Sequence, residues 1–121
     1  MKALLCVAHG SKREASNIEF QTMVSQLKVK LADSFCSIEA AFLEFAVPDI
    51  QDALKVMLDS GATHIYIYPF FLNSGKHVVQ DIPLIIQTIQ NNYPALIFET
   101  LPHFGSSSNI LSVITNDLKN L

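Results

Sequence analysis

Hydrophobic positions along the chain follow two alternating patterns. Short apolar runs recur, and each is followed by a longer stretch in which apolar residues return every three or four positions. The short runs are typical of β-strands buried on both faces, and the longer stretches are typical of amphipathic helices. The sequence therefore predicts strands at 3–8, 36–43, 63–69 and 95–100, each followed by a helix.

The starts and the apolar faces of the helices can also be predicted. Pro48 and Asp49 suit the first turn of the second helix. Asp81 and Pro83 suit the first turn of the third helix. The last helix is expected to begin near 107–109. The apolar faces consist of Phe20, Met23, Val24, Leu27 and Leu31, then Ile50, Ala53, Leu54, Met57 and Leu58, then Ile82, Ile85, Ile86 and Ile89, and finally Ile110, Leu111, Ile114 and Leu118.

Strands that alternate with helices predict a doubly wound α/β fold, in which helices cover both faces of a four-stranded parallel sheet. Four strands favour the flavodoxin-like order 2-1-3-4. In that order, ligands bind outside the carboxyl ends of the strands, at the switch point between strands 1 and 3. The chain has 121 residues, so we expect a single α/β domain over 1–121.

Composition and charge argue against several classes of protein. Hydrophobic residues make up 50% of the chain and charged residues 16%, which favours a packed core over disorder. The net charge of −3 disfavours a nucleic-acid-binding protein. No apolar run approaches the roughly 20 residues of a membrane-spanning helix. Cys6 and Cys36 do not form a C-x-x-C pair, which argues against a structural zinc site. We therefore expect a reduced, cytoplasmic protein with no membrane segment.

Three side chains that can bind a metal or accept a proton follow the strands around the predicted switch point. His9 comes directly after the first strand, Glu44 after the second, and His77 in the loop after the third. Since neighbouring strands lie about 4.8 Å apart, these side chains can converge. Two imidazoles and a carboxylate suit a divalent ion such as cobalt, nickel, zinc or ferrous iron. The alternative is that His9 caps the adjacent helix and His77 is an ordinary loop residue.

The remaining histidines and the cysteines are expected to have smaller roles. His64 begins the third strand at the amino-terminal edge of the sheet, where ligands rarely bind. His103 follows the fourth strand and could make a peripheral substrate contact. Cys6 is expected to be a small buried hydrophobe, and Cys36 a structural residue.

The loops that carry His9 and His77 also contain candidate substrate contacts. They hold three of the eight basic residues, which favours an anionic ligand in an acidic chain. An aromatic residue after the third strand could form an apolar wall for a flat ring. No phosphate-binding P-loop, dinucleotide fingerprint or G-x-S-x-G elbow is present. The candidate contacts are Ser11, Lys12, Arg13, Phe70, Ser74, Gly75 and Lys76.

Four segments, taken in order, resemble the class II chelatases. They are Val7–Ser11 (VAHGS), Phe42–Ile50 (FLEFAVPDI), Pro69–His77 (PFFLNSGKH) and Asp81–Pro83 (DIP). The combination is similar to the short-form sirohydrochlorin cobaltochelatase family, which includes related iron and nickel chelatases, and it covers nearly the whole chain. The sequence departs from the family pattern at Leu101–Ser108, where the family often has a leucine-glycine pair and then a His-Pro pair.

The resemblance implies that a divalent metal, cobalt before nickel or iron, is inserted into the tetrapyrrole sirohydrochlorin with neither ATP nor an organic cofactor. It makes His9 and His77 the metal ligands and Glu44 the acidic residue of the site. Because double-length members carry two such halves around one cleft, it also implies a homodimer. Two alternatives remain. One is a non-catalytic metal or tetrapyrrole carrier. The other is a phosphoryl-transfer enzyme using His9, although Ala8 stands where such enzymes carry an arginine.

Overall fold

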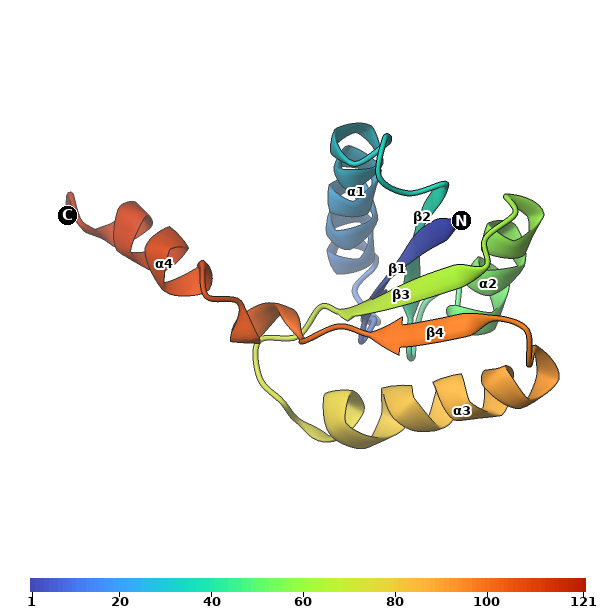
Figure 1. Ribbon diagram of the computed structural model, residues 1–121. Helices are drawn as coiled ribbons and strands as arrows, with labels where there is room; N and C mark the ends of the chain where they lie inside the picture. Colours follow the sequence, from blue (N-terminus) through green and yellow to red (C-terminus); the bar gives the residue numbers. More distant parts are fainter.

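The computed structural model describes residues 1–121 and places one parallel sheet between helices (Figure 1). The sheet consists of β1 (Lys2–Ala8), β2 (Ser37–Phe42), β3 (His64–Pro69) and β4 (Ile97–Thr100). All neighbouring strands are parallel, and their order is β2-β1-β3-β4. The predicted α/β class and strand order are therefore confirmed, and the sheet has the expected switch point between β1 and β3.

The helices divide between the two faces of the sheet. α1 (Glu14–Lys30) packs on one face, and α2 (Ile50–Asp59) and α3 (Ile82–Asn92) pack on the other (Figure 1). A π-helical turn, η1 (His77–Asp81), leads directly into α3. None of the helices combines the length and the apolar character that crossing a bilayer requires.

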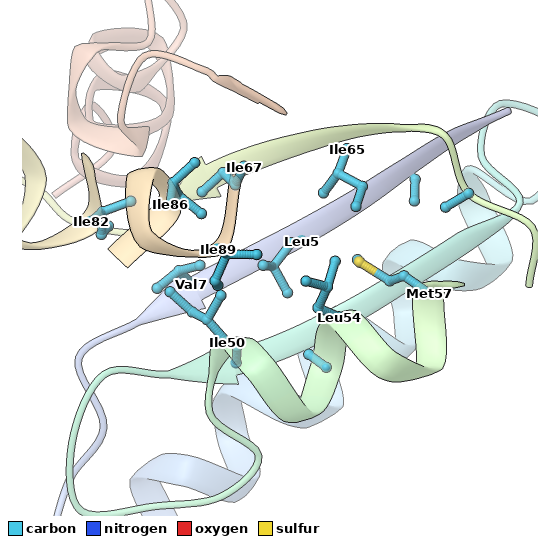
Figure 2. Close-up of a cluster of buried hydrophobic side chains, with 14 residues drawn as sticks. Leu5, Val7, Ile50, Leu54, Met57, Ile65, Ile67, Ile82, Ile86 and Ile89 are labelled. Atoms are coloured by element: carbon cyan, nitrogen blue, oxygen red, sulfur yellow. The ribbon is translucent and has the colours of Figure 1, made fainter. Parts of the chain in front are cut away.

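The larger of two cores lies between the sheet and the pair α2 and α3 (Figure 2). Leu5, Ile65 and Ile67 of the sheet meet Met57 of α2 and Ile89 of α3, and all five are buried. Such β-branched and leucine side chains fit a strand that is covered on both faces. The apolar faces predicted for the first three helices are confirmed. α1 buries Phe20 and Val24 and packs its other predicted apolar residues against them, and α2 and α3 each bury at least three residues of the predicted face.

α4 (Ile110–Leu118) differs from the other helices. It extends away from the carboxyl edge of the sheet, and none of its residues is buried (Figure 1). The preceding 3-10 turn, η2 (Phe104–Ser106), is held against the loop after β3, where the N–H of Gly105 donates to the carbonyl of Phe71 at 2.9 Å. The predicted helix is confirmed, but its apolar face does not pack on the sheet of the same chain.

Candidate active site

His9 and Glu44 are joined at the carboxyl ends of β1 and β2. Backbone hydrogen bonds continue past the strands: the N–H of Leu43 donates to the carbonyl of Ala8 at 3.0 Å, and the N–H of Glu44 donates to that of His9 at 2.9 Å. The side chains also meet, with His9 Nε2 2.9 Å from Glu44 Oε2. α1 instead begins after Arg13, so the structure does not support the alternative in which His9 caps that helix.

Gly10 makes this close approach possible. Its φ is +92°, in the region that residues other than glycine rarely adopt. A Cβ on Gly10 would lie 1.9 Å from the backbone oxygen of Glu44. Glycine at this position therefore lets the two loops touch, and it places Glu44 beside His9.

His77 reaches the same place from a different element. It was expected in a loop, but it opens the π-helical turn η1 that leads into α3. Its ring lies beside that of His9, with 4.4 Å between the ring centroids. The predicted convergence of His9, Glu44 and His77 is thus present in the structure.

Asp81, predicted only as the start of a helix, is also a hydrogen-bond partner of His77. Its Oδ2 lies 2.7 Å from His77 Nδ1, four positions along the chain. An ionised carboxylate only accepts hydrogen bonds, so Nδ1 carries the proton in this pair. In a neutral imidazole, this leaves Nε2 with a free lone pair. The spacing of a histidine and a carboxylate at i and i+4 before an apolar helix was the available signal.

Aromatic rings border the imidazole pair. Phe45, which is 56% exposed, meets the edge of His9 with 5.7 Å between centroids. The ammonium group of Lys12 lies 5.4 Å from the centre of the Phe45 ring, so one of the predicted substrate contacts is beside the site. Phe45 was not predicted as a site residue, although it follows Glu44 directly.

Phe71, rather than Phe70, faces the imidazoles. The Phe71 ring stacks on His77 at a centroid distance of 6.0 Å. Phe70 points to the α1 side of the sheet, where it packs between Phe20 and Phe104 at 5.4 and 4.9 Å. The ring beside the site is thus that of Phe71, whereas Phe70, the predicted substrate contact, packs on the other face of the sheet.

The other candidate contacts occupy the two loops and make few interactions. The backbone N–H of Ser11 donates to Asn17 at 2.9 Å, which orders the start of α1. Arg13 is exposed, and so are Ser74, Gly75 and Lys76 in the turn that leads to His77. These residues border the site without touching its central side chains.

The remaining histidines and cysteines lie outside this constellation. His64 is at the amino-terminal edge, where its ring stacks on Tyr66 at 4.4 Å and its Nε2 is buried without a hydrogen-bond partner. His103 precedes η2. Burial raises the pKa of the Cys6 thiol to about 12, so this thiol is protonated at neutral pH and unsuited to binding metal.

A cavity of about 300 Å³ opens beside Glu44 and His77, between the loop after β2 and the first turns of α3. Its walls combine polar groups of the site with apolar side chains of α3. The structure contains no group of three or more histidine, cysteine, aspartate or glutamate side chains arranged so that it could hold a metal ion. The residues that line the cavity are Leu43, Glu44, His77, Asp81, Leu84 and Ile85.

A doubly wound sheet with paired imidazoles and carboxylates at its switch point defines an α/β protein with a candidate divalent-metal site. Comparison with known proteins gives the family. The sequence model of the CbiX family matches residues 3–121, and the chain belongs to this family. The resemblance to the sirohydrochlorin chelatases is thereby confirmed.

Three similar proteins illustrate the relationship. The sirohydrochlorin cobaltochelatase of Sulfolobus acidocaldarius is 32% identical over 114 residues, which cover 94% of this chain and 87% of the relative. The chloroplastic sirohydrochlorin ferrochelatase of Arabidopsis thaliana is 28% identical over 96% of this chain and 51% of its own length. The crystal structure of the sirohydrochlorin chelatase SirB from Bacillus subtilis subspecies spizizenii in complex with cobalt superposes with a TM-score of 0.88 and 26% identity, over 99% of this chain and 50% of that chain. The chain thus spans about half the length of the latter two proteins.

Proposed function

We propose that this protein inserts a divalent metal ion into sirohydrochlorin or a close relative, with the ion as a substrate. The observation that carries the proposal is the pair formed by His9 and His77, whose ring centroids are 4.4 Å apart beside the carboxylate of Glu44. Neutral imidazoles bind cobalt, nickel and iron readily. The sirohydrochlorin chelatase names of the relatives support the same reaction, with cobalt or iron as the ion.

Insertion exchanges two protons for one metal ion. Each of two pyrrole N–H groups loses its proton, and the freed nitrogen lone pairs bind the incoming ion while the imidazoles release it. Glu44 is the proposed proton acceptor, because its carboxylate adjoins His9 and is 54% exposed, so it can return a proton to water. The aromatic rings of Phe45 and Phe71 would offer apolar contacts to the flat macrocycle.

Asp81 is the proposed positioning residue for His77. Its hydrogen bond to Nδ1 fixes the orientation of the ring and leaves Nε2 for the metal. Carboxylates that hold metal-binding histidines in this way are common, and they raise the basicity of the ligand. Both residues of this pair lie in the π-helical turn, so no other segment is needed to bring them together.

The basic residues of the two loops suit an anionic substrate. Lys12 lies over Phe45 beside His9, and Lys76 directly precedes His77. A positive rim would attract a macrocycle that carries acidic side chains. We further propose a homodimer, since one layer of this kind can cover only one of the two faces of a flat tetrapyrrole.

The test is a turnover measurement. A small amount of protein is mixed with an excess of sirohydrochlorin and Co²⁺, and the absorption spectrum of the macrocycle is followed against a protein-free control. The proposal predicts many insertions per protein molecule. A carrier would instead give a spectral change that stops at one equivalent, and this outcome would overturn the proposed reaction.

The same assay examines Glu44. The substitution Glu44→Gln keeps the shape of the side chain and removes its capacity to accept a proton. It is expected to slow insertion more than it weakens Co²⁺ binding. An equal loss of both would show that Glu44 acts as a metal ligand rather than as the base.

A further inference from the structure

Asn17 is a buried polar residue in the first turn of α1, on the side of the helix that faces the core. It is 3% exposed, whereas its neighbour Ile18 is 53% exposed. It stands three positions before Phe20, which packs in the smaller of the two cores. Burying an amide costs free energy unless the amide is hydrogen-bonded, so a polar side chain at this position needs partners of its own.

Both ends of the Asn17 amide bind the backbone of one residue, Ser11. The N–H of Ser11 donates to Asn17 Oδ1 at 2.9 Å, and Asn17 Nδ2 donates to the carbonyl of Ser11 at 2.8 Å. Nδ2 also lies 3.5 Å from Glu14 Oε2. Because hydrogen bonds are directional, the two bonds together fix both the position and the orientation of Ser11 against α1. We call these two bonds the Ser11 clamp.

The Ser11 clamp acts on the loop that carries His9. Gly10 joins His9 to Ser11 with a φ of +92°, and glycine adopts positive and negative φ about equally readily. Gly10 alone therefore does not select the conformation that brings His9 to Glu44. On its other side, His9 is held by the N–H of Glu44, which donates to the His9 carbonyl at 2.9 Å. Ser11 is the second anchor, and without it the loop is held on one side only.

We propose that Asn17 is a positioning residue for His9. By holding Ser11 against α1, it keeps the His9 ring beside that of His77, at the observed centroid distance of 4.4 Å. The position matters because two imidazoles that share one ion must each direct a nitrogen at it. His77 has its own support in Asp81, whose Oδ2 lies 2.7 Å from Nδ1. The inference rests on the proposed function, in which both rings bind the ion.

NMR of the metal-free protein tests the positioning without a measurement of activity. Asn17→Leu fills a similar volume and removes the Ser11 clamp. It is expected to abolish the nuclear Overhauser contact between the rings of His9 and His77, while the contact between the rings of His77 and Phe71 persists. Val24→Ala is the control, because Val24 is 2% exposed in the same helix and its truncation weakens the core without touching the clamp. This variant should keep both contacts.

Calorimetric titration with Co²⁺ gives the second readout. Asn17→Leu should bind Co²⁺ about 10- to 100-fold more weakly than the wild type, the range typical of lost support for a metal-binding histidine. Val24→Ala should bind Co²⁺ as tightly as the wild type, although it unfolds at a lower temperature. If Asn17 served only the stability of the fold, both variants would unfold more easily and both would keep the Co²⁺ affinity of the wild type.

Two further measurements decide the question even if Asn17→Leu does not fold. Asn17→Asp keeps an acceptor for the N–H of Ser11 but has no donor for its carbonyl, so Co²⁺ should bind about tenfold more weakly. In the wild type, the Ser11 amide should exchange with solvent more slowly than in an unfolded peptide. An unprotected Ser11 amide, or a ring contact and a Co²⁺ affinity that both survive loss of the clamp, would overturn the proposal. A ring contact that depends on Asn17 in a protein without turnover refutes the proposed reaction alone.

Discussion

Histidines lie at both edges of the sheet, but their hydrogen-bond partners differ. At the carboxyl edge, His9 and His77 each present one ring nitrogen to a carboxylate, at 2.9 and 2.7 Å, and their rings lie side by side. At the amino edge, His64 stacks on Tyr66, and its Nε2 is buried without a partner. The difference shows that the chemistry of an imidazole in this fold depends on its edge, because the segments that follow the strands at the carboxyl edge bring imidazoles and carboxylates together.

The comparison predicts its largest effect for the histidines themselves. His9→Ala and His77→Ala are each expected to abolish metal insertion, because each removes one of the two imidazoles proposed to bind the ion. Both side chains are more than a third exposed, so the free energy of unfolding should change by no more than about 1 kcal/mol. His64→Ala is the matched control, and insertion should continue at a rate close to that of the wild type. The measurement is the absorption assay together with thermal unfolding of each variant.

Asp81→Asn should have the next largest effect. An asparagine side chain can still contact His77, but it no longer holds the proton on Nδ1 with a charged acceptor. Loss of such a carboxylate typically lowers metal affinity by about 10- to 100-fold. Calorimetric titration with Co²⁺ measures the change, and Asp52→Asn, at the start of α2, serves as the control. An unchanged Co²⁺ affinity in Asp81→Asn would show that Asp81 does not position His77 for metal binding.

Two glycines with similar backbone angles extend the comparison to stability. Gly10 at the carboxyl edge has φ +92°, and Gly61 at the amino edge has φ +83°. A Cβ at Gly61 meets only the side chain of Met1, at 3.8 Å, whereas one at Gly10 collides with Glu44. Gly61→Ala should therefore cost about 1 kcal/mol of backbone strain, and Gly10→Ala about 2 kcal/mol or more. Urea unfolding tests the difference, and equal losses would contradict the close approach described for Gly10.

The last effect is absent at neutral pH; it appears only in alkaline solution and concerns Cys6, in β1 between the two edges. Burial raises the pKa of its thiol from 9.0 to about 12. Above pH 9 the unfolded chain loses this proton while the folded chain keeps it, so the free energy of unfolding should fall as pH rises toward 12. Cys6→Ala should flatten this fall without abolishing it, because burial also raises the pKa of Tyr68. Unfolding curves between pH 8 and pH 11 would reveal the change in slope.

The sequence predicted the fold and the three central side chains because both follow from strand position. A buried run such as 3–8 identifies a strand, and a residue that follows a parallel strand must lie at its carboxyl edge. His9, Glu44 and His77 needed no further information to be brought together.

The structure added what depends on details beyond the ends of the strands. The π-helical turn that joins His77 to Asp81 has no periodicity of its own, so His77 was expected in a loop. The sequence could not show that Phe71 rather than Phe70 lies beside His77, because the direction of a side chain reverses with each residue and the chain turns just past Pro69. The apolar stripe of α4 predicted a helix, but a stripe alone does not say which surface covers it.

The most direct measurement of the central claim is an NMR titration that observes all four histidine side chains while a diamagnetic ion, Zn²⁺, is added. The account predicts that the ring nitrogens of His9 and His77 shift together and saturate at one ion per chain, whereas those of His64 and His103 do not move. A response confined to His64 or His103, or the absence of any shift at His9 and His77, would contradict the assignment of the metal site.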